Sequence, residues 1–403
     1  MYDDAYGMER AAVKVLHLIT ALETGGAETM LHKLLSGMDR TAFESRVVSL
    51  VDPGEMGERI AALNVPVGGL GMRRGAPGPG GLLRLARLLR GWRPDVVQTW
   101  LYHADLLGVL ATRLARIGTV AWTPRVAWNI RCSYMDFSRY RRTTRWTVAV
   151  CARLSGLPDA VLTNSEEARR FHLGLGYHPR RFEVIPNGFD TERFRPDPLA
   201  RAAVRAELGV ADAAPLAGLF GRLDPMKGVD DFVRAARLVA RDLSGARFVL
   251  AGKGMEPENP ALRSLLDGAG LRERFVPLGQ RSDPERVMAA LDVYVSASLG
   301  EGFPNVLGEA MACGVPCVTT DAGDSAAVVG ETGRIVPCGD PEALARELGA
   351  LLRLPEAARA SLSASARERI RTGYALDRII ARYCDFYRGL VPGGDGFRCG
   401  HGG

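Results

Sequence analysis

The chain has 403 residues, of which 47% are hydrophobic and 24% are charged, an ordinary composition for a soluble globular protein. This length favours two or three domains over a single one. No apolar run reaches the roughly 18 residues of a membrane-spanning helix, and the polar N-terminus does not have the pattern of a secretory signal. The seven cysteines are scattered without a CxxC pair, which indicates free thiols in a reducing compartment, so we expect a cytoplasmic protein.

The net charge of +6 is unevenly distributed. Residues 73–153 contain 15 arginines against three aspartates, and nine aromatic residues are interleaved with them. Such a patch attracts anionic partners, and arginines mixed with aromatic rings suit a membrane interface. We therefore expect contact with an anionic membrane, at the inner face of the plasma membrane. No nucleic acid is expected, because no nucleic-acid motif accompanies the patch. A charged face without a partner remains the alternative.

Strands and helices alternate along the first half. The expected strands are residues 13–19, 46–51, 96–99, 160–164 and 183–185. The expected helices are residues 29–38, 82–91, 104–116 and 166–173, the second of them basic and amphipathic. Residues 68–81 are rich in Gly, Pro and Arg, which predicts an exposed loop. This alternation implies a parallel sheet covered by helices on both faces.

The second half repeats the alternation after a predicted linker at residues 191–214, which contains a helix rich in Ala and Arg. Its expected strands are residues 216–220, 247–251, 275–278, 293–296, 317–320 and 334–336. Its expected helices are residues 230–239, 283–290 and 342–352, with a last helix near 375–388. The pattern predicts an α/β protein with two Rossmann-like domains, at residues 1–195 and 196–374. Residues 391–403 are Gly-rich, and we expect a disordered tail.

The segment from Gly300 to Ala310 places two carboxylates eight positions apart. Glu301 lies in a glycine-flanked loop after a buried strand, and Glu309 lies inside the helix that Pro304 opens. Glu301 therefore stands at a strand's carboxyl end, where open α/β sheets bind ligands. The backbone N–H groups around Phe303 to Val306 form an anion site at the helix N-terminus. An anion site beside two carboxylates that can bind hydroxyls suits a sugar nucleotide.

Arg222 and Lys227 follow the first strand of the second half. Two cations at one strand end can stabilise a pyrophosphate leaving group, on which negative charge grows as the glycosidic bond breaks. The alternative is a solvent-exposed loop with two ordinary charges. No D-x-D triad stands at a suitable strand end, so we expect neither a metal ion nor another cofactor.

The first half offers further candidates. Gly25 and Gly26 follow its first strand and let the backbone approach a phosphate or an acceptor closely. They do not form a G-x-G-x-x-G motif, which disfavours a dinucleotide cofactor. Glu28 is more readily explained by the helix dipole than by catalysis. His103 lies just beyond a strand and is a catalytic candidate, whereas Asp105 is first a helix N-cap.

Together these motifs resemble family-4 retaining glycosyltransferases of the GT-B fold. The resemblance runs from Val13 to about Arg388. It rests on the E-x7-E segment and on four further motifs in the right order: Thr24-Gly25-Gly26-Ala27-Glu28, Pro186-Asn187-Gly188-Phe189-Asp190, Gly221-Arg222-Leu223-Asp224-Pro225-Met226-Lys227-Gly228 and Gly330-Glu331-Thr332-Gly333-Arg334-Ile335-Val336. Each motif alone is weak, but the ordered set is specific.

The resemblance implies two Rossmann-like domains facing a central cleft, with a C-terminal helix at residues 375–390 crossing back to the N-terminal domain. It implies that residues 1–195 bind the acceptor and residues 196–374 the nucleotide sugar. For the donor, it implies that Arg222 and Lys227 bind the diphosphate, that Glu301 binds the transferred sugar and that Glu309 binds the ribose. It also implies donor contacts at Gly25 and Gly26 and a catalytic His103 near the reacting sugar. The donor-binding loop would consist of Gly302, Phe303, Pro304, Asn305 and Val306. Asn187 and Gly188 would form a hinge or wall at the domain junction.

The implied function is a retaining transfer to a glycan hydroxyl, on a lipid-linked acceptor, in cell-envelope or exopolysaccharide biosynthesis. A UDP-sugar is the favoured donor and a GDP-sugar the second choice. Transfer to a soluble small molecule is one alternative. A nucleotide-sugar epimerase or hydrolase on the same fold is another, although it would need a denser set of carboxylates and histidines. The non-enzyme alternative is a basic protein that binds nucleic acid or membranes.

Overall fold

The computed structural model describes residues 12–23, 25–73, 78–117, 122–132 and 142–391. They form two compact units. The first unit contains residues up to 164, residues 168–185 and the chain from 379 onward, and the second contains residues 165–167 and 186–378. These boundaries differ from the expected 195 and 374. The reason is Phe189, whose N–H donates to Tyr374 O (2.9 Å) and whose carbonyl accepts from Leu376 N–H (2.9 Å). The expected tail at 391–403 lies almost wholly outside the described residues.

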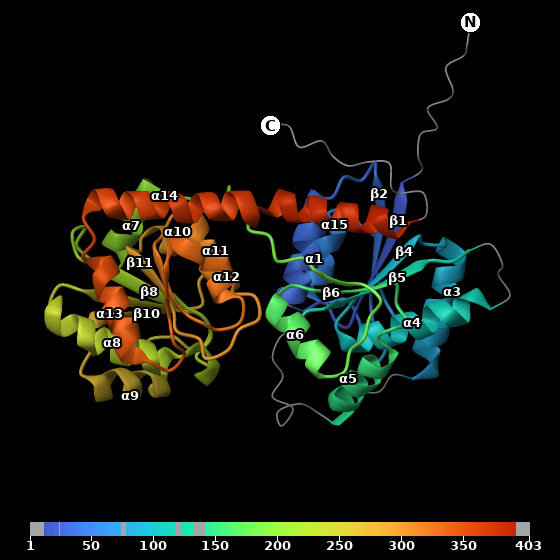
Figure 1. The fold of residues 1–403 in the computed structure, drawn as a ribbon, viewed down its shortest axis with the longest axis horizontal. Helices are drawn as coiled ribbons and strands as arrows, with labels where there is room; N and C mark the ends of the chain where they lie inside the picture. Colours follow the sequence, from blue (N-terminus) through green and yellow to red (C-terminus); the bar gives the residue numbers. More distant parts are fainter. Residues whose placement is uncertain (1–11, 24, 74–77, 118–121, 133–141, 392–403) are drawn as a thin grey trace, which may run out of the picture. The chain divides into compact units, whose positions relative to one another are not determined.

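The first unit is built on a seven-stranded sheet in which every recorded pairing is parallel, in the order β3-β2-β1-β4-β5-β6-β7 (Figure 1). Its strands are β1 (Val13–Ile19), β2 (Phe43–Ser49), β3 (Val67–Gly69), β4 (Val96–Trp100), β5 (Arg125–Ile130), β6 (Ala160–Thr163) and β7 (Phe182–Val184). Its helices are α1 (Gly26–Gly37), α2 (Glu55–Ala61), α3 (Pro79–Trp92), α4 (Tyr102–Arg116), α5 (Arg142–Leu154), most of α6 (Glu166–Gly174) and the end of α15 (Leu376–Leu390). The sequence did not predict β3, β5, α2 or α5.

The predicted loop at residues 68–81 is only partly a loop. Its start belongs to β3, which pairs with β2, and its end belongs to α3. The basic helix α3 is amphipathic as expected, but its apolar residues Leu85, Ala86 and Leu89 are buried in the core of the unit. Arg90 of α3 donates to the carbonyl oxygens of the last turn of α4. The apolar face of α3 is therefore used for folding and is closed to a membrane.

The C-terminal helix α15 packs on the first sheet, as the resemblance implied. Tyr387 donates its hydroxyl to Gln98 Oε1 of β4. The Tyr383 hydroxyl accepts from Asn129 Nδ2 at 3.3 Å and from Arg131 Nη1 at 3.3 Å, both at the end of β5. These are buried polar contacts, so they fix the position of α15 as well as stabilise it.

The second unit contains a six-stranded sheet, again with parallel pairings throughout, in the order β10-β9-β8-β11-β12-β13. Its strands are β8 (Leu216–Phe220), β9 (Arg247–Ala251), β10 (Phe275–Gly279), β11 (Val293–Ser296), β12 (Cys317–Thr320) and β13 (Arg334–Val336). Its helices are α7 (Pro198–Glu207), α8 (Val229–Asp242), α9 (Pro260–Ala269), α10 (Pro284–Ala289), α11 (Asn305–Ala312), α12 (Ser325–Val329), α13 (Pro341–Leu352) and α14 (Glu356–Gly373). All six expected strands are present, whereas α9, α12 and α14 were not predicted.

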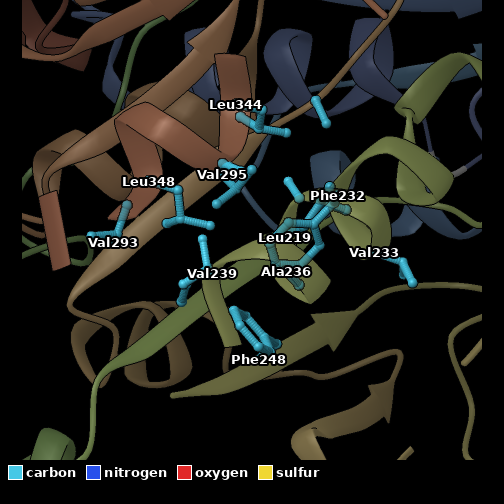
Figure 2. Packing of buried hydrophobic residues seen from close by; sticks show 14 of the residues in the cluster. Leu219, Phe232, Val233, Ala236, Val239, Phe248, Val293, Val295, Leu344 and Leu348 are labelled. Atoms are coloured by element: carbon cyan, nitrogen blue, oxygen red, sulfur yellow. The ribbon is translucent and has the colours of Figure 1, made fainter. Parts of the chain in front are cut away.

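Two hydrophobic cores lie on opposite faces of this sheet, because successive side chains of a strand point to opposite faces. Figure 2 shows the first, in which Leu219 of β8 and Val293 and Val295 of β11 meet Phe232 of α8 and Leu344 of α13. The second contains the alternate positions Leu216, Phe220 and Tyr294, packed against α7, α10 and α11. Strands buried on both faces explain the nearly continuous apolar runs in the sequence.

The predicted linker at residues 191–214 is instead an integral part of the second unit. Helix α7 carries Arg205, which is 1% exposed. Its guanidinium group pairs with Asp292 (2.7 Å) and donates to the carbonyl oxygens of Ala290 and Ala214. A buried arginine needs such partners, and a flexible linker could not hold them in place.

The described residues contain neither a membrane-spanning helix nor a disulfide bond. No helix among them is both long and apolar enough to cross a membrane. The cysteines among them are unpaired: Cys132, Cys151, Cys313, Cys317, Cys338 and Cys384. Cys399 lies outside the described ranges.

Candidate active site

The candidate donor site lies in the second unit, where β8 and β11 end side by side. After β8 the chain makes a short 3-10 turn, Pro225–Lys227, which the Asp224 carboxylate caps by accepting from Met226 N–H at 2.9 Å. Met226 O in turn accepts from Leu299 N–H of the loop after β11, at 2.9 Å. Gly228 ends the turn at φ +61°, and a side chain there would collide with Ala297 O. The two loops are thus held against each other.

Lys227 and Glu301 meet in this arrangement. Lys227 Nζ donates to Glu301 Oε1, and the Ser298 hydroxyl donates to the same oxygen at 2.7 Å. The backbone of Ser298 is fixed by Thr320 Oγ1, which donates to Ser298 O at 2.6 Å. Both partners of Glu301 use Oε1, so Oε2 has no hydrogen-bond partner within the described part of the chain.

A cavity opens beside this pair. Its lining comes from β8, β11, the loop after β11 and the first turn of α11: Leu219, Phe220, Lys227, Tyr294, Ser296, Ala297, Ser298, Glu301, Phe303, Pro304, Asn305, Val306 and Leu307. Six of the predicted donor residues are therefore brought together: Lys227, Glu301, Phe303, Pro304, Asn305 and Val306.

The other predicted donor residues do not line this cavity. Arg222 is exposed on the loop after β8, and no described residue forms an ion pair with it. Glu309 is half-buried in the second turn of α11. Gly302 lies next to Glu301, and its carbonyl oxygen accepts a hydrogen bond from Asp324 N–H at 3.1 Å. Gly25 and Gly26 belong to the first unit.

The Pro-Asn-Gly-Phe segment has a role that the sequence did not reveal. Asn187 Nδ2 donates to Asn305 Oδ1 at 2.7 Å, at the first residue of α11. The Phe189 ring stacks on Phe303, with the ring centroids 5.9 Å apart, and it fills the space where Gly308 has no side chain. The segment thus positions the start of α11. Ser298 was also missed, although it stands at the end of the apolar run that predicted β11.

In the first unit, Gly25 is the N-cap of α1, and a side chain there would collide with the Glu28 carboxylate. Gly25 therefore leaves room for Glu28, which is buried in the first turn of α1 near Arg131. Burial raises the pKa of Glu28 above its usual range, and the nearby Arg131 guanidinium partly opposes this shift. Close approach of a phosphate to Gly25 and Gly26 stays a prediction.

His103 is the second residue of α4, and burial lowers the pKa of its imidazole, so the ring is neutral at pH 7. The N-cap of α4 is Leu101, and the expectation that Asp105 caps this helix is wrong. Asp105 lies a turn inside, where its side chain is fully buried and Thr99 Oγ1 donates to Asp105 Oδ1 at 2.5 Å. The structure leaves the catalytic assignment of His103 as a prediction.

No group of three or more His, Cys, Asp and Glu side chains in the described ranges could hold a metal ion. The expectation of an enzyme without a metal ion stays a prediction.

These features define a protein of the GT-B type. It has two parallel Rossmann-like sheets, a C-terminal helix that packs on the first sheet, and a lysine–carboxylate site at the strand ends of the second. Comparison with known proteins supports this class. The family described as "Glycosyl transferases group 1" matches residues 214–353, and "Glycosyltransferase Family 4" matches residues 24–193. The Rhizobium meliloti lipopolysaccharide core biosynthesis mannosyltransferase LpsB is 30% identical over 328 residues, covering 77% of this chain and 84% of that protein. The chain belongs to glycosyltransferase family 4.

Two further relatives have similar coverage. An Escherichia coli UDP-Gal:alpha-D-GlcNAc-diphosphoundecaprenol alpha-1,3-galactosyltransferase is 26% identical, covering 77% of this chain and 79% of that protein. A Mycobacterium tuberculosis GDP-mannose-dependent alpha-(1-6)-phosphatidylinositol monomannoside mannosyltransferase is 28% identical, covering 78% and 80%. Among solved structures, Anabaena HepE in complex with UDP superposes with a TM-score of 0.79 at 22% identity, covering 94% of this chain and all of that one. The likeness to HepE shows the GT-B fold.

Proposed function

We propose that this chain transfers a sugar from a nucleotide-diphosphate sugar to a hydroxyl group of a glycan, with retention of the anomeric configuration. The observation that carries the proposal is the meeting of Lys227 and Glu301 at one cavity beside the first turn of α11. Cations at this place can hold a diphosphate, and a carboxylate can hold sugar hydroxyls. Arg222 and Lys227 would take the place of a metal ion.

Each predicted donor contact has a place in this proposal. Lys227 and Arg222 bind the diphosphate, and the start of α11 faces it with backbone N–H groups. Glu301 accepts hydrogen bonds from hydroxyls of the transferred sugar. Glu309, one turn further into α11, accepts from the ribose hydroxyls.

In the reaction, the bond between the anomeric carbon and the β-phosphate oxygen breaks, and its electron pair leaves on the diphosphate. The acceptor oxygen bonds to the same carbon, and its proton passes to a diphosphate oxygen. Arg222 and Lys227 stabilise the growing charge. Among the described residues that line the cavity, Glu301 is the sole carboxylate, and Lys227 and Ser298 already hold it. This supports departure and attack on one face of the sugar without a covalent intermediate.

The donor base we propose is uridine. A relative that names UDP-Gal as its donor and the similarity in fold to HepE, solved with UDP, support this choice. A relative that names GDP-mannose makes guanosine the second candidate.

The acceptor we propose is a lipid-linked glycan in cell-envelope or exopolysaccharide biosynthesis, bound by the first unit with His103 near the reacting sugar. The named relatives support this choice, since their names include a diphosphoundecaprenol, a phosphatidylinositol and a lipopolysaccharide core. The neutral imidazole of His103 could accept or donate a hydrogen bond there.

We also propose that the first unit meets an anionic membrane surface from the cytoplasmic side, through one face of α5. Trp146 is 65% exposed on this helix. Arg142, Arg145 and Arg153 are exposed along it, and the helix contains no acidic residue. An exposed Trp among arginines suits the interface of an anionic bilayer, whereas the buried apolar face of α3 does not.

The diphosphate assignment predicts that Arg222→Ala and Lys227→Ala each slow sugar transfer about a hundredfold, corresponding to about 3 kcal/mol in the barrier. A thermal-shift panel of UDP, GDP, ADP and dTDP first selects the donor base, because a bound nucleotide stabilises the folded protein. Transfer from the matching nucleotide sugar is then measured. Arg371→Ala is the matched control, since Arg371 pairs with Glu368 on the exposed side of α14. Transfer at nearly the wild-type rate in both site variants would refute the assignment.

A further inference from the structure

Lys227 and Glu301, which the proposed function assigns to different parts of the donor, are bonded to each other. Their side chains are 27% and 15% exposed, so the pair is largely shielded from water. Separating such a pair leaves a charge without its partner in a poorly hydrated place, which is unfavourable. A diphosphate that draws Lys227 away from Glu301 must therefore bring something that satisfies the carboxylate.

Arg222 differs from Lys227 in this respect. It is exposed, with no ion pair to any residue in the described ranges, so it can meet a diphosphate at no cost to another contact. Lys227 becomes available only when Glu301 gives it up. The two cations of the site are therefore unequal.

The two nucleotide species that visit the site differ in what they offer Glu301. A sugar donor brings hydroxyl groups that can donate to Oε2, and its β-phosphate, which carries the sugar, has a charge of about −1. A spent nucleoside diphosphate brings no hydroxyl there, and its unsubstituted terminal phosphate carries about −1.5 to −2 charges at pH 7. The spent nucleotide thus takes Lys227 away, leaves the Glu301 carboxylate with the Ser298 hydroxyl as its remaining partner in the described residues, and adds a like charge beside it.

Resting on the proposed function, we propose that Glu301 is the residue that distinguishes the sugar donor from the spent nucleotide. Through its bond to Lys227 it weakens binding of the free nucleoside diphosphate, and through Oε2 it strengthens binding of the donor. Glu301 is thus a specificity-determining residue that favours release of the product. Glu309 has no such role, because both species carry the same ribose.

Calorimetric titration of the full chain, without acceptor, tests this proposal with UDP and a UDP-sugar, or with the GDP pair if that base is selected. Glu301→Gln keeps the shape of the side chain and removes its charge. We expect this variant to bind the free diphosphate more tightly and the donor more weakly, so that its preference for the donor falls about tenfold or more. Glu309→Gln should weaken both ligands alike. Glu368→Gln, an exposed carboxylate paired with Arg371 on α14, is the matched control and should change neither.

Equal changes for both ligands in Glu301→Gln would overturn the proposal. A wild-type chain that binds neither a nucleoside diphosphate nor a nucleotide sugar would instead overturn the proposed function. Glu301→Asp provides a second variant if the amide destabilises the fold. It keeps the charge with a shorter reach, so the free diphosphate should bind as in the wild type while the donor binds more weakly. Tighter diphosphate binding in Glu301→Asp would also count against the proposal.

Discussion

Asp105 of α4 carries a carboxyl group that the fold encloses completely. Thr99 Oγ1 donates to Asp105 Oδ1, and Oδ2 has no hydrogen-bond partner within the described ranges. Burial raises the pKa of Asp105 from 3.8 to about 8. The carboxyl group is therefore neutral at pH 7, and it lies beside the junction of β4 and α4, where Leu101 has an unusual φ of +72°. This junction also carries His103.

The raised pKa of Asp105 predicts how stability depends on pH. Between pH 4 and 8 the folded state holds a proton that the unfolded state has released, so this group's contribution to stability falls as the pH rises through that window. The slope is about 1.4 kcal/mol per pH unit at most. Asp105→Asn keeps a neutral group of the same shape and should flatten the dependence. Denaturant unfolding at several pH values measures the unfolding free energy of both proteins and so this pH dependence.

The difference in unfolding free energy between the wild type and Asp105→Asn isolates the contribution of Asp105. This difference is needed because the buried His17 changes stability with pH in the opposite direction. Burial lowers the pKa of His17 to about 3, so its contribution is lost as the pH falls below 6.5 in both proteins. If the difference in unfolding free energy between the two proteins stays constant from pH 4 to 8, the carboxyl group of Asp105 is ionised in the folded state.

Single residues of the candidate donor site could be predicted from sequence only by type and spacing. The E-x7-E pattern and the Arg-x4-Lys pattern predicted that Glu301 and Lys227 lie at one place, because strand ends and helix starts fix where the backbone passes. The bond between these two residues could not be predicted, because it depends on side-chain conformations and on two loops held together by Met226 O and Leu299 N–H. Asn187 was missed as a support for α11 for the same reason.

Among the elements, α15 shows how a helix is fixed by polar contacts as well as by apolar ones. Its apolar residues Ile379, Phe386 and Leu390 are buried, and its two tyrosines reach the polar groups of β4 and β5. Gln98 in β4 is fully buried, so its side-chain oxygen depends on the Tyr387 hydroxyl.

Tyr387→Phe should destabilise the first unit by about 1–3 kcal/mol, because it leaves a buried acceptor without its donor. Thermal unfolding of the full chain measures the effect. Tyr374→Phe is the matched control, since the Tyr374 hydroxyl donates at 3.4 Å to Ala327 O on the exposed side of its unit. A melting temperature for Tyr387→Phe equal to that of the control would show that the Gln98 contact contributes nothing to stability.

The elements that the sequence predicted well are those with strong local signals. Strands β1, β8, β9, β11 and β12 coincide with their expected ranges, because their sequences are largely buried runs bounded by turn residues. Strand β13 also coincides with its range, although only Val336 of its three residues is buried. Strand β3 was missed because it has three residues, two of them glycine, and depends on pairing with β2. Helix α14 was missed because only Ala366 and Ile370 of its 18 residues are buried, which gives little periodic pattern.

For the whole molecule, the arginine excess between residues 73 and 153 predicts reversible binding to anionic membranes. Each basic residue near such a surface contributes about 1 kcal/mol at most, so several are needed and salt should weaken the binding. We expect co-sedimentation with anionic vesicles at low salt, and a clear loss with Trp146→Ala or Arg145→Glu on the exposed face of α5. Arg371→Glu on α14 is the control.

Two outcomes of the vesicle experiment would contradict membrane docking. One is equal partitioning to neutral and anionic vesicles, and the other is no partitioning at low salt. Either would favour a soluble acceptor, such as a small-molecule aglycone, without affecting the donor site.

The measurement that tests the central claim most directly is hydrogen exchange of the full chain with and without the nucleoside diphosphate that stabilises it. The account predicts slower exchange in residues 221–228 and 298–309, where Lys227, Glu301 and the start of α11 surround the cavity. Binding that leaves both segments unprotected, or no binding of any nucleoside diphosphate, would contradict it.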